Sequence, residues 1–77
     1  MSVEERLKKI IMNQLGVDER KVVSSASLVE DLHADSLDLV ELMIAMEEEF
    51  NIDIKPEEME LLSTVGETED YLEKRTS

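Results

Sequence analysis

The chain has 77 residues, of which 42% are hydrophobic and only 3% aromatic, and it has no Cys, so we expect one small domain without disulfides or thiolate chemistry of its own. Its 20 acidic residues outweigh 8 basic ones and give a net charge of −12, which excludes nucleic acid as a direct partner, because binding it requires basic phosphate contacts. No run approaches the ~20 apolar residues of a membrane span, and the first residues lack a signal-like apolar region, so we expect a cytoplasmic protein without membrane insertion.

The first predicted helix covers about residues 3 to 15. The SVEE segment at residues 2–5 has the form of a capping box, Gly16 suits a helix carboxyl end, and apolar residues recur between them at helical spacing. A long connection follows at residues 17–34. Its apolar residues indicate that it is packed rather than loose, and the SLVE segment at residues 27–30 is a further capping box that predicts a short turn.

The second predicted helix covers about residues 36 to 50, and either Asp35 or Ser36 can cap it. At 100° per residue its apolar side chains divide into two arcs. The core arc holds Leu39, Leu42, Met43, Met46 and Phe50. The second arc holds Leu37, Val40 and Ile44, flanked by Glu41, Glu47 and Glu48. An apolar patch inside an acidic rim is typical of a partner site, although the pattern leaves open a fully buried helix whose acids serve only solubility.

The rest of the chain predicts two more helices. Pro56 suits the first turn of a short helix, PEEMELL, and the TVGE capping box at residues 64–67 begins a longer one that ends near Lys74. No segment alternates for long enough to predict a strand, since FNIDI at residues 50–54 is a single short piece. We therefore predict an all-α fold: one domain over residues 1–77, a small four-helix bundle of three longer helices and one short helix, with a long first loop.

Catalytic and metal-binding chemistry find little support. His33 is the only His and lies near Ser36 and three Asp residues (Asp31, Asp35 and Asp38). A catalytic triad needs a base bonded to the nucleophile, an orienting group and an oxyanion hole, and no nucleophile elbow or glycine-rich loop is present, so we expect no catalytic residue. The Asp residues lack EF-hand spacing, so we expect no dedicated metal site, while weak surface binding of Ca²⁺ or Mg²⁺ stays open.

The segment DLHADSLDLVELMIAMEEEF at residues 31–50 closely resembles the prosthetic-group segment of acyl carrier proteins of type II fatty acid synthesis. Asp35, Ser36 and Leu37 match the Asp-Ser-Leu attachment triplet of that family. The likeness covers nearly the whole chain, through EERLKKIIMNQLGV, SLVEDL, the Pro-Glu-Glu turn, STV and the closing DYL.

The resemblance implies a non-enzymatic carrier of acyl chains, held as thioesters on a 4′-phosphopantetheine arm attached to Ser36. A phosphopantetheinyl transferase would move the arm from coenzyme A with Mg²⁺, and Asp35 would assist that metal. Basic patches on fatty acid biosynthesis enzymes would bind Leu37, Asp38, Val40, Glu41, Ile44, Glu47 and Glu48. The acyl chain would lie in a cavity lined or bordered by Leu42, Met43, Met46, Phe50, Ile54, Met59, Leu62 and Leu72. Such a carrier is expected to be a monomer.

The chain departs from the family pattern at several positions. His33 stands where the family typically has Gly, and we hypothesise that it charges near neutrality close to the phosphate. Pro56 comes one position later than usual, which puts the start of the third helix in doubt. Met59, Leu61 and Thr68 replace residues that are often smaller or polar and could alter chain-length preference. The alternatives are a carrier of another cargo (polyketide, aminoacyl or specialised lipid) or an unmodified acidic helical interaction protein.

Overall fold

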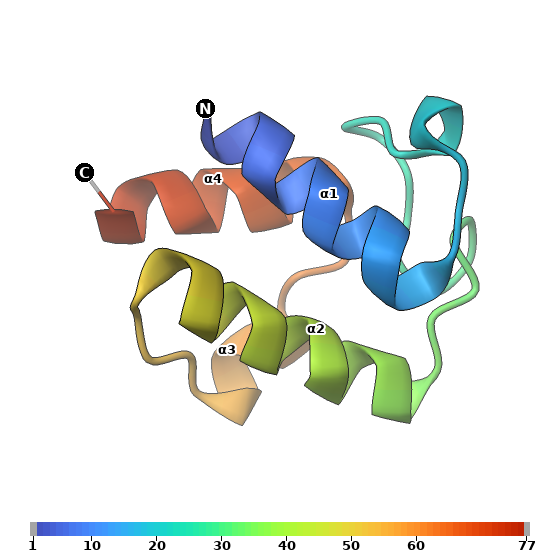
Figure 1. Ribbon diagram of the computed structural model, residues 1–77. Coiled ribbons are helices and arrows are strands. Elements are labelled where there is room, and N and C mark those ends of the chain that lie inside the picture. Colours follow the sequence, from blue (N-terminus) through green and yellow to red (C-terminus); the bar gives the residue numbers. More distant parts are fainter. Residues whose placement is uncertain (1, 77) are drawn as a thin grey trace.

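The computed structural model describes residues 2–76, which form a small bundle of helices (Figure 1). Its elements are α1 (Val3–Leu15), a 3₁₀ turn η1 (Glu19–Lys21), α2 (Ser36–Phe50), α3 (Pro56–Glu60) and α4 (Val65–Thr76). α1 packs against both α2 and α4, and the first connection loops out beside one end of α1 and α2 (Figure 1). The described residues contain no β-strand and one isolated β-bridge, between Ser27 and Thr64, so the all-α prediction is confirmed.

The two longest helices have the bounds that the sequence predicts, because their caps form as expected. At the start of α1 the Ser2 hydroxyl accepts a hydrogen bond from the Glu5 N–H at 3.1 Å. Gly16 follows the helix at φ 64°, a left-handed conformation that suits glycine, and its N–H donates to a carbonyl of the last turn. α2 ends in the same manner at Asn51, which has φ 54° and donates its N–H to the Glu47 carbonyl.

The ends of the last two helices differ from the prediction. α3 begins at Pro56 as expected but stops at Glu60. Leu61 and Leu62 lie beyond it, because their N–H groups make tight hydrogen bonds to carbonyls three residues earlier and turn the chain away from the helix axis. Leu61 is consequently 75% exposed. α4 runs to Thr76 rather than ending near Lys74.

Short local turns shape the first connection. The η1 turn was not predicted; it forms because the Asp18 carboxylate accepts the Arg20 N–H at 2.8 Å. The turn predicted at residues 27–30 is confirmed, since the Ser27 hydroxyl accepts the Glu30 N–H at 3.1 Å, although no helix follows.

Backbone hydrogen bonds join this connection to the segment that leads into α4. The Leu28 N–H donates to the Ser63 carbonyl at 3.0 Å, and the Gly66 N–H donates to the Ser24 carbonyl at 2.9 Å. A Cβ at residue 66 would collide with the Ser24 hydroxyl and lie 3.0 Å from the Ser24 carbonyl oxygen, so glycine favours this close approach. The connection is therefore a packed part of the fold, as predicted. Of the apolar residues expected to anchor it, Val22, Leu28 and Leu32 are buried, whereas Val23 and Val29 are exposed.

One hydrophobic core joins the four α-helices and the first connection. Its buried side chains are Leu7, Ile11, Val22, Ala26, Leu28, Leu32, Ala34, Leu42, Met46, Phe50, Ile54, Met59, Val65 and Leu72. Thr68 is also buried, and its hydroxyl is satisfied by the Thr64 carbonyl at 2.8 Å. Within the described part of the chain no helix is both long and apolar enough to cross a membrane.

Candidate functional site

Ser36 is the first residue of α2, and its neighbour Asp35 caps the helix. The Asp35 carboxylate accepts the Asp38 N–H at 2.8 Å, and the Asp38 carboxylate accepts the Asp35 N–H at 3.1 Å. The sequence left both Asp35 and Ser36 as candidates for this cap, and the structure assigns it to Asp35. The Ser36 side chain is exposed and makes no hydrogen bond within residues 2–76, so its hydroxyl is accessible for chemistry.

The turn before Ser36 is anchored in the hydrophobic core. Leu28, Leu32 and Ala34 are buried in the core, and the Ala34 N–H donates to the Leu28 carbonyl at 2.9 Å. Between them His33 adopts φ 61°, with its side chain turned out to solvent. Ser36 therefore follows a turn that is anchored in the core.

The three Asp residues considered for a cation serve the backbone instead. Asp35 and Asp38 form the capping box, and the Asp31 carboxylate accepts the Ser27 N–H at 2.7 Å. Across residues 2–76, no three acidic, His or Cys side chains are grouped closely enough to hold a metal ion. One carboxylate oxygen of Asp35, Oδ2, makes no hydrogen bond in this part of the chain.

An apolar groove of about 450 Å³ opens beside Ser36, between α2 and α3. It is lined by Ser36, Leu39, Val40, Met43, Pro56, Met59 and Glu60. Of the residues expected around an acyl cavity, Met43 and Met59 line this groove. Leu42, Met46, Phe50, Ile54 and Leu72 lie deeper, in the core, and Leu62 packs partly buried against it.

Four lining residues were not expected there: Leu39, Val40, Pro56 and Glu60. Leu39 was placed on the core arc and Val40 on the partner arc. At 100° per residue, Met43 and Val40 are the adjacent members of the two arcs, so the groove runs along the boundary between them. The sequence carried that signal, but only the position of α3 shows that the boundary is covered by a second helix.

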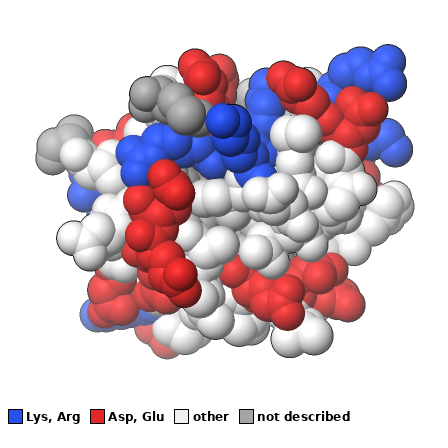
Figure 2. All heavy atoms as spheres, in the orientation of Figure 1, with Lys and Arg blue, Asp and Glu red and all other residues white. Residues whose placement is uncertain are grey.

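The second arc of α2 is exposed, which decides against a fully buried helix. Leu37, Val40 and Ile44 are 65%, 47% and 45% exposed. Glu41 and Glu48, which flank them, are also exposed. Figure 2 shows Lys and Arg side chains gathered mainly over α1 and the first connection, whereas the part of this face over α2 carries acidic and uncharged side chains.

Two other acids expected in the partner surface also hold the backbone. Asp38 is half-buried in the capping box, and the Glu47 carboxylate accepts the Ile54 N–H at 2.8 Å, which ties α2 to the connection before α3. Glu41 and Glu48 make no such bond within the described residues, so they are the carboxylates most available to a basic partner.

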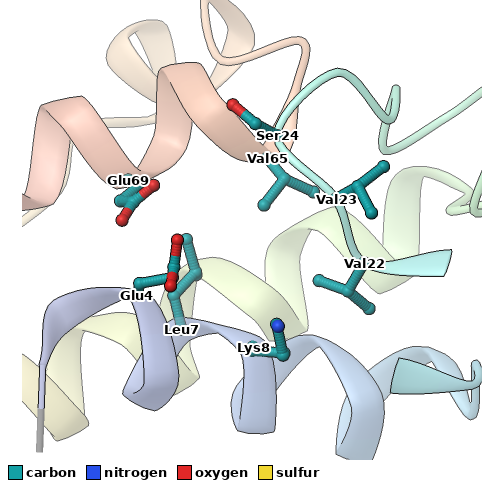
Figure 3. A pocket seen from close by; sticks show the side chains of 8 residues that line it. All are labelled: Glu4, Leu7, Lys8, Val22, Val23, Ser24, Val65 and Glu69. Carbon is teal, nitrogen blue, oxygen red and sulfur yellow. The ribbon is translucent and has the colours of Figure 1, made fainter. Parts of the chain in front are cut away.

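A second pocket, of about 240 Å³, lies between α1, α4 and the first connection (Figure 3). The Glu4 and Glu69 carboxylates point toward one another across it. Burial, and then the neighbouring Glu4, raises the pKa of Glu69. No residue of α2 or α3 lines this pocket, so it is separate from the groove beside Ser36.

Comparisons with known proteins agree with this arrangement. The family model described as the phosphopantetheine attachment site matches residues 5–72. A solved structure of a candidate acyl carrier protein from Mycobacterium tuberculosis is similar, with a TM-score of 0.89 and 31% sequence identity over 96% of this chain and 99% of that one. Members of this family bear covalently attached 4′-phosphopantetheine. The chain therefore belongs to the phosphopantetheine attachment site family, as a carrier of the acyl carrier protein type.

Proposed function

We propose that Ser36 accepts the 4′-phosphopantetheine arm and that the protein carries acyl chains on it during fatty acid biosynthesis. The observation that carries the proposal is the Ser36 hydroxyl, exposed and without a hydrogen bond in the described chain, at the mouth of an apolar groove. Ser36 also stands at the amino end of a 15-residue helix, where free N–H groups and the helix dipole favour a phosphate. Once attached, the arm supplies the thiol that this Cys-free chain lacks.

Asp35 suits the role of helping a transferase's Mg²⁺. Its Oδ1 is engaged in the cap and orients the carboxylate, while Oδ2 makes no hydrogen bond in residues 2–76. A carboxylate oxygen is a ligand that Mg²⁺ prefers. An acid directly beside a phosphate-bearing Ser would otherwise be unfavourable by like-charge repulsion.

The groove supports an acyl cargo. Leu39, Met43 and Met59 present aliphatic and thioether side chains along it, and unbranched Met side chains adapt to variable contents. Burial of a chain there removes apolar surface from water, at roughly 0.8 kcal/mol per methylene. We therefore propose that a fatty acyl chain bound to the arm folds back into this groove.

The exposed arc of α2 supports a docking role. Leu37, Val40 and Ile44 would meet an apolar depression on a partner enzyme, and Glu41 and Glu48 would meet its basic rim. A patch of this size with charges screened by salt gives weak, rapidly reversible binding. That suits a carrier that visits several enzymes in turn as a monomer in the cytoplasm.

The decisive experiment is an intact-mass measurement after incubation with coenzyme A, Mg²⁺ and a broad-specificity phosphopantetheinyl transferase. We expect the wild type to gain the mass of one arm and Ser36→Ala to gain none. Ser63→Ala serves as a matched control at an exposed Ser outside the helices and should be modified like the wild type. If the wild type gains no mass, the carrier proposal fails; if Ser36→Ala still gains it, the attachment site is elsewhere.

The cargo is tested separately, by the mass of the thioester-bound group on protein isolated from its native host. Straight-chain fatty acyl groups are expected. A polyketide or aminoacyl group would place the carrier in another pathway.

A further inference from the structure

α3 forms one wall of the groove, although it is only five residues long. Pro56, Met59 and Glu60 of α3 face Leu39 and Met43 of α2 across the groove. Met59 is the one buried residue of α3, and a helix this short has little stability of its own. Something else must fix the wall in place.

Arg75, in the last turn of α4, reaches across to this region. Its Nη2 donates to the Asp53 carbonyl, in the connection before α3, at 2.8 Å. Its Nη1 donates to the Tyr71 hydroxyl at 2.6 Å and lies 3.8 Å from a carboxylate oxygen of Glu58 in α3. One guanidinium therefore joins α4 to α3 and to the connection that leads into it.

Tyr71 and Glu58 support this arrangement from either side. The guanidinium lies 5.5 Å from the centre of the Tyr71 ring, within cation–π range. Burial raises the pKa of the Tyr71 phenol, which stays protonated at physiological pH. The Glu58 carboxylate also accepts the Lys55 N–H at 3.3 Å, at the start of α3, so the side chain that pairs with Arg75 is the one that caps the helix.

Arg75 holds α3 through several hydrogen bonds and one ion pair together, rather than through the ion pair alone. The Arg75 and Glu58 side chains are 35% and 38% exposed, so their ion pair alone contributes little. The planar guanidinium, however, offers several donors in a rigid fork, and a Lys ammonium cannot reproduce their directions. The bond to a carbonyl oxygen and the bond to the phenol therefore matter as much as the charge.

We propose that Arg75 is a positioning residue that holds α3 as the wall of the acyl groove and thereby determines how well long acyl chains are sheltered. This inference rests on the proposed carrier function. Loss of the Arg75 contacts should free α3 to move away from α2, and it should do so without disturbing α1, whose contacts to α2 and α4 are separate.

The functional test measures cleavage of the thioester by hydroxylamine on protein loaded with acetyl or octanoyl groups. In the wild type the octanoyl thioester should be cleaved more slowly than the acetyl thioester, because its chain lies in the groove. In Arg75→Gln we expect octanoyl cleavage to rise about fivefold, with acetyl cleavage unchanged. Arg75→Lys should resemble Arg75→Gln, and Tyr71→Phe should give a smaller rise in the same direction.

The matched control is Arg20→Gln. It removes the same charge from an Arg that is also paired with an acid, Asp18, but in the first connection. In this variant hydroxylamine should cleave the octanoyl thioester at the wild-type rate. If Arg75→Gln leaves the octanoyl rate unchanged, or raises the acetyl rate equally, Arg75 does not position the groove.

A second measurement, amide hydrogen exchange on the unmodified protein, separates this inference from the carrier function. Arg75→Gln should speed exchange at Met59, Leu61 and Leu62, whose N–H groups bond within and just after α3 at 3.1 Å, while α1 amides keep their wild-type protection. This pattern supports the positioning role even if Ser36 is never modified. Unchanged exchange in α3, or an equal rise in α1, would overturn it.

Discussion

At the scale of single residues, the backbone assigns different roles to two neighbours that the sequence treats alike. Asp35 is extended, at φ −94° and ψ −176°, whereas Ser36 already belongs to the helix. A side chain at the cap position, where the backbone is extended, can accept a hydrogen bond from the N–H three residues later in the helix. Asp35 takes that position, and the Ser36 hydroxyl is consequently left free, which is what attachment of the arm requires.

His33 is a second residue whose backbone carries information. Its φ of 61° lies in the left-handed region, where a side chain with a Cβ is crowded. The imidazole is exposed and makes no hydrogen bond to another described residue, so no contact of this kind offsets the cost. The expectation that His33 lies near the phosphate of the arm stays a prediction.

We expect His33→Gly to raise the free energy of unfolding by about 0.5 kcal/mol. Relief of the left-handed strain, roughly 1 kcal/mol or more, exceeds the added flexibility of glycine in the unfolded chain. Urea denaturation at constant pH measures the change. The control is Asn51→Gly, at the other non-Gly residue with positive φ among residues 2–76. Its free energy of unfolding should rise less, because Asn tolerates this conformation. A less stable His33→Gly variant would contradict the account.

At the scale of elements, α1 and α4 meet with their acidic residues close together. The pKa of Glu69 is raised above its ordinary 4.5 by burial first and then by the nearby carboxylates of Glu4, Glu73 and Asp70, while Lys8 opposes the shift. The folded state therefore holds this proton more tightly than the unfolded state does. Stability should rise as the pH falls from neutrality through the folded pKa, and this contribution is complete below about 4.5.

Glu69→Gln should accordingly be more stable than the wild type at pH 7, by about 0.5 kcal/mol, because it removes a charge that burial and then the neighbouring acids disfavour. The difference in stability should shrink as the pH falls through the folded-state pKa of Glu69, because the wild-type carboxyl then becomes protonated. Thermal unfolding at several pH values measures it. Glu30→Gln, at an exposed acid in the first connection, is the matched control. A difference that is constant with pH would show that charge is not the cause.

α2 illustrates how one element serves several purposes. Leu42, Met46 and Phe50 on its core arc are buried, and Leu37, Val40 and Ile44 on its second arc are exposed. Leu39 and Met43 of the core arc, with Val40 of the second, line the groove. Arg6 adds a fourth role, because it donates to the Glu49 carbonyl at 2.7 Å and lies 4.3 Å from the centre of the Phe50 ring. The carboxyl end of α2 is thereby fixed to α1.

At the scale of the whole molecule, charge is distributed unevenly. Residues 22–54 contain nine Asp or Glu and no Lys or Arg, and α2 lies within this stretch. Such a distribution creates a negative field that attracts basic partners and speeds their encounter.

Glu41→Lys should therefore slow modification by the phosphopantetheinyl transferase several-fold in kcat/KM at low ionic strength. The deficit should shrink toward 1 M salt, where the screening length is about 3 Å. Glu19→Lys, the same change of charge on η1, is the control and should have a smaller effect. Equal losses in both variants would mean that net charge, and not the α2 surface, steers the partner; a Glu41→Lys rate equal to wild type would remove the electrostatic account.

The sequence by itself determined the helices, because their signals are local. Ser2 and Gly16 bracket α1, the two apolar arcs define α2, and Pro56 begins α3, all through contacts within a few residues. The resemblance of the Asp-Ser-Leu triplet and of nearly the whole chain to acyl carrier proteins, and not the local pattern, made Ser36 the candidate attachment site. The early end of α3 was missed, because it depends on where the chain must turn to reach Ser63 and its bond with Leu28.

Only the tertiary structure decided what lies between the helices. The groove beside Ser36 exists because α3 packs next to Leu39 and Met43, and α3 in turn depends on Arg75, which comes from the last turn of α4. These contacts join residues far apart in the chain, and no spacing rule predicts them. Side-chain periodicity specifies which face of a helix is apolar, but not which part of that face another element leaves open.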